Sequence, residues 1–384
     1  MRHATRHHRL GGHLAAIPAA VAIVALLAAA PIASAAPRDP VATGTADLHL
    51  KRGMVRKLGN LGVTVQALGA AGVTGNKISL PVREGRVDPT DGSGFLRLRG
   101  GFKLSRGKRG VPLTEVLVHT VRGAVYANVA RAKMQIGTLD PPSVARDGFG
   151  ARVKEPRLVL NQNAARRISN RLGLSGGRRI NPGRALSNVF AAVQPRTVVV
   201  LPQGTATLEA DKAVLGKLVA KGVKAPQGIT PIAPATGKAP AGFEFPITGG
   251  TLSPQADAGT LTTAGGVQIV KEAEPFSPTV SLREIQVDFA ARTATVQLEI
   301  GPTPPFPGVV GRSSIADVTL PQGSVSTDPA QRTITIKGAE ARLQAVAAAT
   351  LNDVFNQPAP TPPPASNFVV GDPLGTFSLT AHAR

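Results

Sequence analysis

The chain has 384 residues, a formal net charge of +21 and no cysteine. This length is enough for two domains that each bury a core, and the absence of cysteine excludes thiolate metal sites, cysteine nucleophiles and disulfides. With one tyrosine and no tryptophan, the cores must be built mainly from Val, Leu, Ile and Ala.

The first residues have the features of a secretory signal peptide, which we place at residues 1–35. A basic start is followed by an apolar run from Leu14 to Ala30, and Ala33-Ser34-Ala35 supplies small side chains for cleavage before Ala36. An uncleaved membrane anchor stays open as the alternative. No later segment is apolar enough to span a bilayer, so we expect a secreted, cell-envelope-associated protein with no transmembrane helix after cleavage.

A repeated pattern of glycine and proline divides the remaining chain into two copies. The segment from Leu80 to Gly101 returns from Phe245 to Gly266, so Pro81 recurs as Pro246, 165 residues later. Turn-forming residues kept at one spacing indicate a tandem duplication of one structural module. We therefore expect a linker at 36–44, a first module at 45–200 and a second module at 201–384.

Each copy begins with a strand and a short helix. The strands are predicted at Thr45–Leu50 and Thr205–Ala210. Apolar residues at helical spacing follow each strand, and Gly62 and Gly222 are placed to end the two helices.

The remainder of each copy is expected to be mostly β. Alternation from Leu96 to Leu104 predicts one half-buried strand, with a hairpin turn at 105–110 and strands around 113–118 and 125–129. Each copy then ends with a strand that leads into a helix, at 157–172 in the first copy and 333–355 in the second, where the helix is expected from Ala339. A Pro-rich crossing at 357–367 precedes a last strand at 377–381. The predicted fold class is mainly β: two tandem antiparallel β-sandwich or open-barrel modules, each with two short helices.

The two copies differ in charge. Residues 41–200 hold 27 Lys and Arg against 8 Asp and Glu, a net of +19, whereas residues 201–384 hold 13 against 14, a net of −1. Arg97, Arg99 and Lys103 are expected on the outward face of one strand, where the second copy has Thr262, Ala264 and Gln268, and three more cations are expected at the hairpin tip, Arg106, Lys108 and Arg109. Such a row predicts binding to an anionic cell-envelope polymer or to anionic lipid headgroups. A basic face that is merely solvated stays open, and the lack of interleaved aromatics argues against specific nucleic-acid binding.

Three residues of the first copy are candidate haem or metal ligands. His49 and His119 lie on predicted strands, and Tyr126 lies on the strand after His119. The second copy has Glu209 and Asp288 in place of the two histidines. Imidazole and phenolate groups can ligate iron if the side chains converge, and ordinary strand positions are the alternative.

The residues Gly173-Leu174-Ser175-Gly176-Gly177 match the serine-hydrolase elbow only in their letters. The elbow needs a strand before the serine and a helix after it, whereas here a helix precedes and an Arg-rich loop follows. No phosphate-cradling loop or zinc motif is present either. We therefore expect a protein that is not an enzyme and has no catalytic residues.

The order of these signals resembles the HtaA family of secreted actinobacterial haem-binding modules. The resemblance rests on Phe245-Pro246, Gly249-Gly250, Gly265-Gly266 and the return from Gly371 to Thr376, and it extends over both copies. It implies haem capture through a tyrosine on the early helix, assisted by histidine, although neither Lys51–Leu61 nor Lys212–Lys221 contains Tyr or His. The sequence thus predicts a secreted, non-enzymatic, HtaA-like envelope-binding protein, with haem as the implied ligand. The alternative is a structural or surface-display protein held on anionic envelope polymers by its basic first module.

Overall fold

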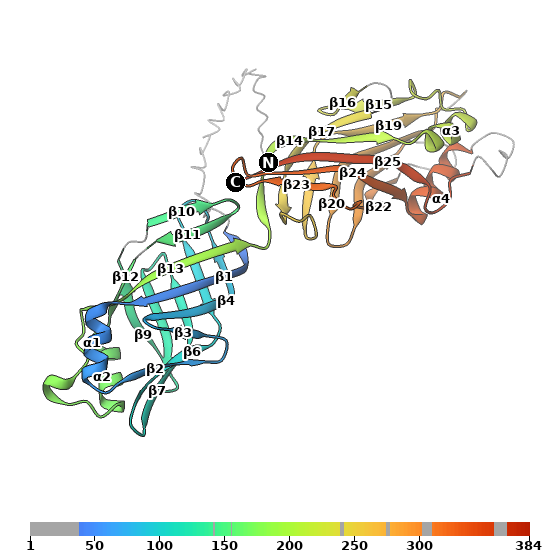
Figure 1. Ribbon diagram of the computed structural model, residues 1–384. Coiled ribbons are helices and arrows are strands. Elements are labelled where there is room, and N and C mark those ends of the chain that lie inside the picture. Colours follow the sequence, from blue (N-terminus) through green and yellow to red (C-terminus); the bar gives the residue numbers. More distant parts are fainter. Residues whose placement is uncertain are drawn as a thin grey trace, which may run out of the picture. The chain divides into compact units, whose positions relative to one another are not determined.

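Figure 1 shows the computed structural model of the chain. The structure describes residues 38–140, 143–154, 156–238, 242–273, 277–301, 309–356 and 367–384. The expected signal peptide at 1–35 and most of the Pro-rich crossing at 357–367 lie outside the described residues. None of the helices in the described part is long and apolar enough to cross a membrane.

The first module is an antiparallel sheet that closes on itself. Its thirteen strands are β1 (Asp39–Leu50), β2 (Thr64–Leu68), β3 (Gly72–Thr74), β4 (Lys77–Val87), β5 (Gly94–Leu98), β6 (Gly101–Arg106), β7 (Arg109–His119), β8 (Ala124–Val129), β9 (Ala132–Leu139), β10 (Ser143–Asp147), β11 (Gly150–Lys154), β12 (Arg157–Leu160) and β13 (Ala185–Pro195). Hydrogen bonding runs in the order β1, β4, β5, β7, β8, β9, β12 and β13, and β13 pairs back with β1.

The second module repeats this closed sheet. Its twelve strands are β14 (Val198–Ala210), β15 (Ile229–Ile232), β16 (Thr236–Lys238), β17 (Gly242–Leu252), β18 (Gly259–Thr263), β19 (Gly266–Val270), β20 (Thr279–Asp288), β21 (Thr293–Ile300), β22 (Val309–Thr319), β23 (Val325–Asp328), β24 (Thr333–Leu343) and β25 (Pro373–Ala383). The ring runs through β14, β17, β18, β20, β21, β22, β24 and β25, which pairs back with β14. The predicted mainly β, antiparallel class is therefore confirmed, with sheets that close rather than stay open.

Two short helices accompany each sheet: α1 (Arg52–Asn60) and α2 (Gln162–Arg171) in the first module, α3 (Lys212–Ala220) and α4 (Ala345–Phe355) in the second. A single 3₁₀ turn at Gly176–Arg178 follows α2. Side chains cap the N-terminal ends of α2 and α3. Asn161 Oδ1 accepts the Asn163 N–H at 2.8 Å, and Asp211 Oδ1 accepts the Ala213 N–H at 2.7 Å.

The repeated glycines hold turns that a side chain would block. Gly100 and Gly265 have φ values of +77° and +79°. A Cβ on Gly100 would lie 2.5 Å from Leu68 O, and one on Gly265 would lie 2.5 Å from Ala235 N. Both positions therefore require glycine, which explains why the duplication kept them.

Two predicted elements are wrong in extent. The strand expected from Leu96 to Leu104 is two strands, β5 and β6, because the chain bends at Gly100. β5 pairs with β4 and β7, whereas β6 pairs with β2 and β7. The helix expected from Ala339 begins only at Ala345, since β24 continues to Leu343 and pairs there with β22 and β25.

The expected linker at 36–44 is shorter than predicted. β1 begins at Asp39 and pairs with β4 from its first residue. The hairpin β10–β11, whose second strand adds to β13, was not predicted from the sequence.

Candidate functional site

The three candidate haem or metal ligands do not meet at one site. His49 lies on β1, with its ring centroid 4.7 Å from that of Phe190. His119 lies on β7 and Tyr126 on the neighbouring β8, three and four places further around the ring than β1. In the described part of the chain, no group of three or more His, Asp or Glu side chains is placed to hold a metal ion.

His119 and Tyr126 share the outward face of the first sheet. Tyr126 pairs with Leu117, which lies two residues before His119 on β7 and so on the same face. The Tyr126 and His119 side chains are both half-buried. Burial, together with the charges of Arg122 and Arg38, holds the pKa of His119 below its usual value. The imidazole is therefore neutral near pH 7, with a buried Nδ1 that has no hydrogen-bond partner in the described structure.

The predicted row of cations is divided between separate places. Arg97 lies on β5 and Lys103 on β6, with the exposed Arg99 in the bend between them. They therefore do not form a ladder on one strand as expected. The exposed Lys108 occupies the tip of the β6–β7 hairpin, where a turn was predicted.

Arg106 points toward the ends of both helices of the first module. Its Nε donates to Leu61 O at 2.9 Å, at the end of α1, and its Nη1 donates to Gly173 O at 3.3 Å, just after α2. The Arg109 guanidinium packs against Gly173. A Cβ added to Gly173 would lie only 1.7 Å from Arg109 Nη1. A cation at helix carboxyl ends satisfies carbonyls that have no partner within the helix.

The second module has a cation at the matching position. Lys271 stands 165 residues after Arg106, the spacing that relates Gly101 to Gly266. Its Nζ donates to Phe355 O, the last residue of α4, at 3.1 Å. Both modules therefore use this strand end to hold a helix carboxyl end.

An apolar cavity of about 90 Å³ lies in the second module between the sheet and its two helices. The lining side chains are aliphatic or aromatic except Ser313 and Thr350, and they include Val214 and Leu218 of α3, Ala347 and Leu351 of α4, and Val267 and Leu298 of the sheet. Val346 of α4, which is 54% exposed, lies at its edge. A space lined in this way holds apolar groups rather than water.

The first module has only about 30 Å³ at the equivalent place. The repeat explains the difference, because Leu50, Met54 and Phe102 of the first module correspond to Ala210, Val214 and Val267 of the second. At one position the second module has the larger side chain, because Phe243 corresponds to Ile78. Smaller side chains at three positions thus leave the second module open where the first is packed.

A surface groove of about 460 Å³ runs along the outer side of α3. Leu215, Val219 and Pro226 form its apolar wall, and Lys212 and Lys238 lie at its rim. Val219 is 53% exposed and supplies apolar surface to the groove. Ala210 and Leu215 line both this groove and the cavity, so the two spaces lie on either side of the same short stretch.

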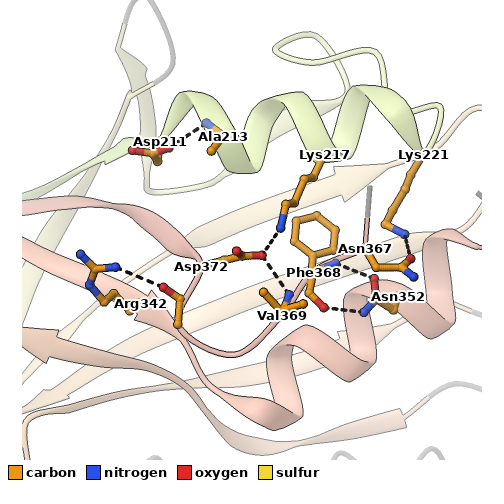
Figure 2. A network of polar contacts seen from close by, with 11 residues as sticks. Asp211, Ala213, Lys217, Lys221, Arg342, Asn352, Asn367, Phe368, Val369 and Asp372 are labelled. Atoms are coloured by element: carbon orange, nitrogen blue, oxygen red, sulfur yellow. Dashed lines mark hydrogen bonds and ion pairs between the residues drawn. The ribbon is translucent and has the colours of Figure 1, made fainter. Parts of the chain in front are cut away.

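Polar contacts fasten α3 to the chain that follows α4 (Figure 2). Lys217 Nζ lies 2.5 Å from Asp372 Oδ2, and the same oxygen accepts the Val369 N–H at 2.9 Å. Asn352 of α4 holds the Phe368 backbone in both directions, at 2.8 Å through its Nδ2 and 2.9 Å through its Oδ1. These contacts fix the two helices that cover the cavity.

Lys221, at the end of α3, is buried in the same network. Its Nζ donates to Asn356 Oδ1 at 2.5 Å and to Asn367 Oδ1 at 3.1 Å, and it lies 5.6 Å from the centre of the Phe368 ring. Burial lowers the pKa of Lys221, and the charges of Lys271 and Lys217 lower it further. Neutral acceptors and helix carboxyl ends replace the carboxylate that a buried lysine would otherwise need.

No protein-family model matches the sequence, and no curated protein does either. Similar folds occur among solved structures from Corynebacterium glutamicum. The C-terminal domain of HtaA is 14% identical, with a TM-score of 0.33, and the match covers 40% of this chain and 98% of that one. The N-terminal domain of HtaA is 15% identical at a TM-score of 0.32, covering 48% and 99%.

The heme binding protein HtaB from the same organism is 15% identical at a TM-score of 0.31, covering 49% of this chain and 95% of that one. Each match spans about half of this chain. At these identities and TM-scores we transfer no residue role from these proteins to this one.

Proposed function

We propose that this protein is a secreted, non-enzymatic binding protein of the cell envelope whose second module takes up an amphipathic acid. The apolar part of the ligand enters the cavity and groove beside α3, and its acidic group lies between Lys212 and Lys238. The observation that carries the proposal is the apolar cavity that the second module keeps and the first module fills.

An unfilled cavity has an energetic cost that a ligand would offset. At about 24 cal/mol per Å³, a cavity of about 90 Å³ costs about 2 kcal/mol relative to a packed core. The first module shows that this fold can pack the same region with larger side chains. A ligand with an apolar chain or ring recovers that packing and the burial of Val219.

The rim of the groove suits an acidic head group. Lys212 is exposed and has no hydrogen-bond or ion-pair partner within the described residues. Lys238 lies 3.3 Å from Glu244 in a loose, half-exposed ion pair, which a carboxylate ligand can replace at little cost. Glu209 also lines the groove, so the ligand is expected to carry few negative charges.

Haem and long-chain fatty acids both belong to this ligand class, since each joins an apolar body to carboxylates. Haem is the ligand that the resemblance to the HtaA family brings into consideration. The side chains lining the cavity and the groove include no His or Tyr, so iron would have no imidazole or phenolate ligand there. We therefore expect haem, where it binds, to be held by its ring and carboxylates rather than through iron.

Titration of the purified chain from Ala36 with haemin and, separately, with a long-chain fatty acid tests the proposal. We expect saturable fatty-acid binding, and a haemin absorption spectrum that stays the same in the Tyr126→Phe, His49→Ala and His119→Ala variants. Absence of saturable binding for both ligands would contradict the proposal. A sharp Soret band that disappears in one of those three variants would instead assign the function to iron ligation by the first module.

The surface-display alternative rests on the charge of the first module, a net of +19 over residues 41–200. In that case the basic module attaches the protein to an anionic envelope polymer, and the second module acts as a spacer. This alternative predicts no saturable small ligand for the second module.

A further inference from the structure

A second groove, of about 220 Å³, lies on the outward face of the first sheet. It crosses β4, β5, β7, β8 and β9, and its polar lining combines three cations, one carboxylate and one amide: Arg83, Arg97, Lys133, Glu115 and Asn128. Of these five residues, only Arg97 was predicted from the sequence to bind anions. The groove lies in the other module from the amphipathic-acid site and does not depend on it.

Two β-bulges direct side chains into this groove. Arg83 is the extra residue of β4, between the pairs Val82–Leu98 and Glu84–Arg97. Glu115 lies in a bulge of β7 with φ of +51°, a left-handed conformation that a glutamate adopts at some cost. Bulges re-aim side chains and are frequent beside binding sites.

The second module keeps the bulges but only one of the three cations. Glu284 has φ of +48° at the position of Glu115, while Thr248 and Thr262 replace Arg83 and Arg97. Arg312, which corresponds to Lys133 by register, is already used there. Its guanidinium donates to Glu284 Oε2 at 3.3 Å and to Gln286 Oε1 at 3.1 Å.

Two of the three cations of the first module have no partner among the described residues, and the third is in an exposed ion pair that a phosphate can replace at little cost. Arg97 Nη1 lies 2.8 Å from Glu84 Oε1 in an exposed ion pair. Arg83 and Lys133 are exposed and have no hydrogen-bond or ion-pair partner in the described part of the chain. Glu115 accepts a single hydrogen bond, from Asn128 Nδ2 at 2.8 Å, and keeps free acceptor capacity.

We propose that this groove binds a phosphorylated polyol or sugar unit. The phosphate oxygens are placed against Arg83, Arg97 and Lys133, because guanidinium groups match phosphate geometry with paired hydrogen bonds. A polyol hydroxyl, which carries no charge and is separate from the phosphate group, donates to Glu115. Inorganic phosphate can offer only a P–OH of the charged group itself, which the carboxylate repels. The groove therefore selects a phosphate that carries a polyol over bare phosphate.

Calorimetric titration at low ionic strength with glycerol phosphate, inorganic phosphate and glycerol tests this proposal on the chain from Ala36. We expect saturable binding of glycerol phosphate, weaker binding of phosphate and none of glycerol. The double variant Arg83→Thr/Arg97→Thr, which introduces the second module's residues, should weaken glycerol phosphate binding by roughly tenfold or more. Arg178→Thr/Arg179→Thr removes the same charge from two exposed arginines outside the groove and should leave binding within about twofold of the parent.

A third variant, Glu115→Gln, separates the groove from general charge attraction. It should bring the affinities for glycerol phosphate and phosphate close together, mainly by strengthening the binding of phosphate. Equal losses in the two double variants, or no preference for glycerol phosphate in the parent protein, would overturn the proposal. Unchanged thermal unfolding in all variants, expected for these exposed side chains, shows that the differences arise from binding.

Discussion

Phe102→Val, which gives the first module the residue found at the same place in the second, is expected to destabilise the first module by roughly 2–4 kcal/mol. Phe102 is 4% exposed and lines a small space of about 30 Å³ between α1, α2 and the sheet. Removing most of its ring opens a cavity, and the loss combines the transfer free energy of the ring with the cost of the cavity.

Tyr126 makes the measurement specific to this module. It is the single tyrosine, the chain has no tryptophan, and Tyr126 lies on β8. Urea unfolding followed by tyrosine fluorescence therefore reports the first module alone. The control is Val121→Ala, a truncation at a side chain that is 57% exposed, which should change stability by less than about 0.5 kcal/mol. Equal effects of both substitutions would mean that Phe102 does not fill this space.

Arg106→Met is expected to lower the stability of the same module by about 1–3 kcal/mol. Its guanidinium donates to Leu61 O and Gly173 O, and without it these partly buried carbonyls at the ends of α1 and α2 lose their donor. The favourable interaction of a cation with two helix carboxyl ends is lost as well.

The matched control for Arg106 is Lys108→Met. Lys108 lies two residues away at the exposed hairpin tip and has no hydrogen-bond or ion-pair partner among the described residues. Its replacement removes the same charge and should leave the tyrosine-detected unfolding midpoint unchanged. If both variants unfold at the parent's urea concentration, Arg106 is a surface cation, as the sequence had suggested.

The sequence predicted the two modules and their β class because a duplication preserves what the backbone needs. Gly100 and Gly265 have no room for a side chain, so they remained in register while their neighbours changed. The split between β5 and β6 was missed for a related reason. Apolar and polar residues alternate on both sides of Gly100, and alternation does not show that the chain turns to a new partner strand.

The candidate sites depended on features that a pattern does not show. Arg83 enters the groove only because a bulge turns it there, and Lys133 lies beside it only through the pairing of β8 with β9. The cavity did leave a signal in the sequence. Comparing the two copies for side-chain size, at Met54 against Val214 and Phe102 against Val267, would have indicated it.

The central claim, a ligand space in the second module, is tested most directly by titration with anilinonaphthalene sulfonate, a fluorescent amphipathic acid. The parent chain is compared with two variants. Val214→Met/Val267→Phe carries the first module's residues, and Ala347→Leu fills the same cavity from α4. We predict one saturable site in the parent, a loss of binding in both filled variants, and equal binding in the exposed-site control Val121→Phe. Stability of the filled variants should be kept or increased by about 1 kcal/mol, since an apolar cavity is filled. Equal binding by the parent and both filled variants would contradict the account.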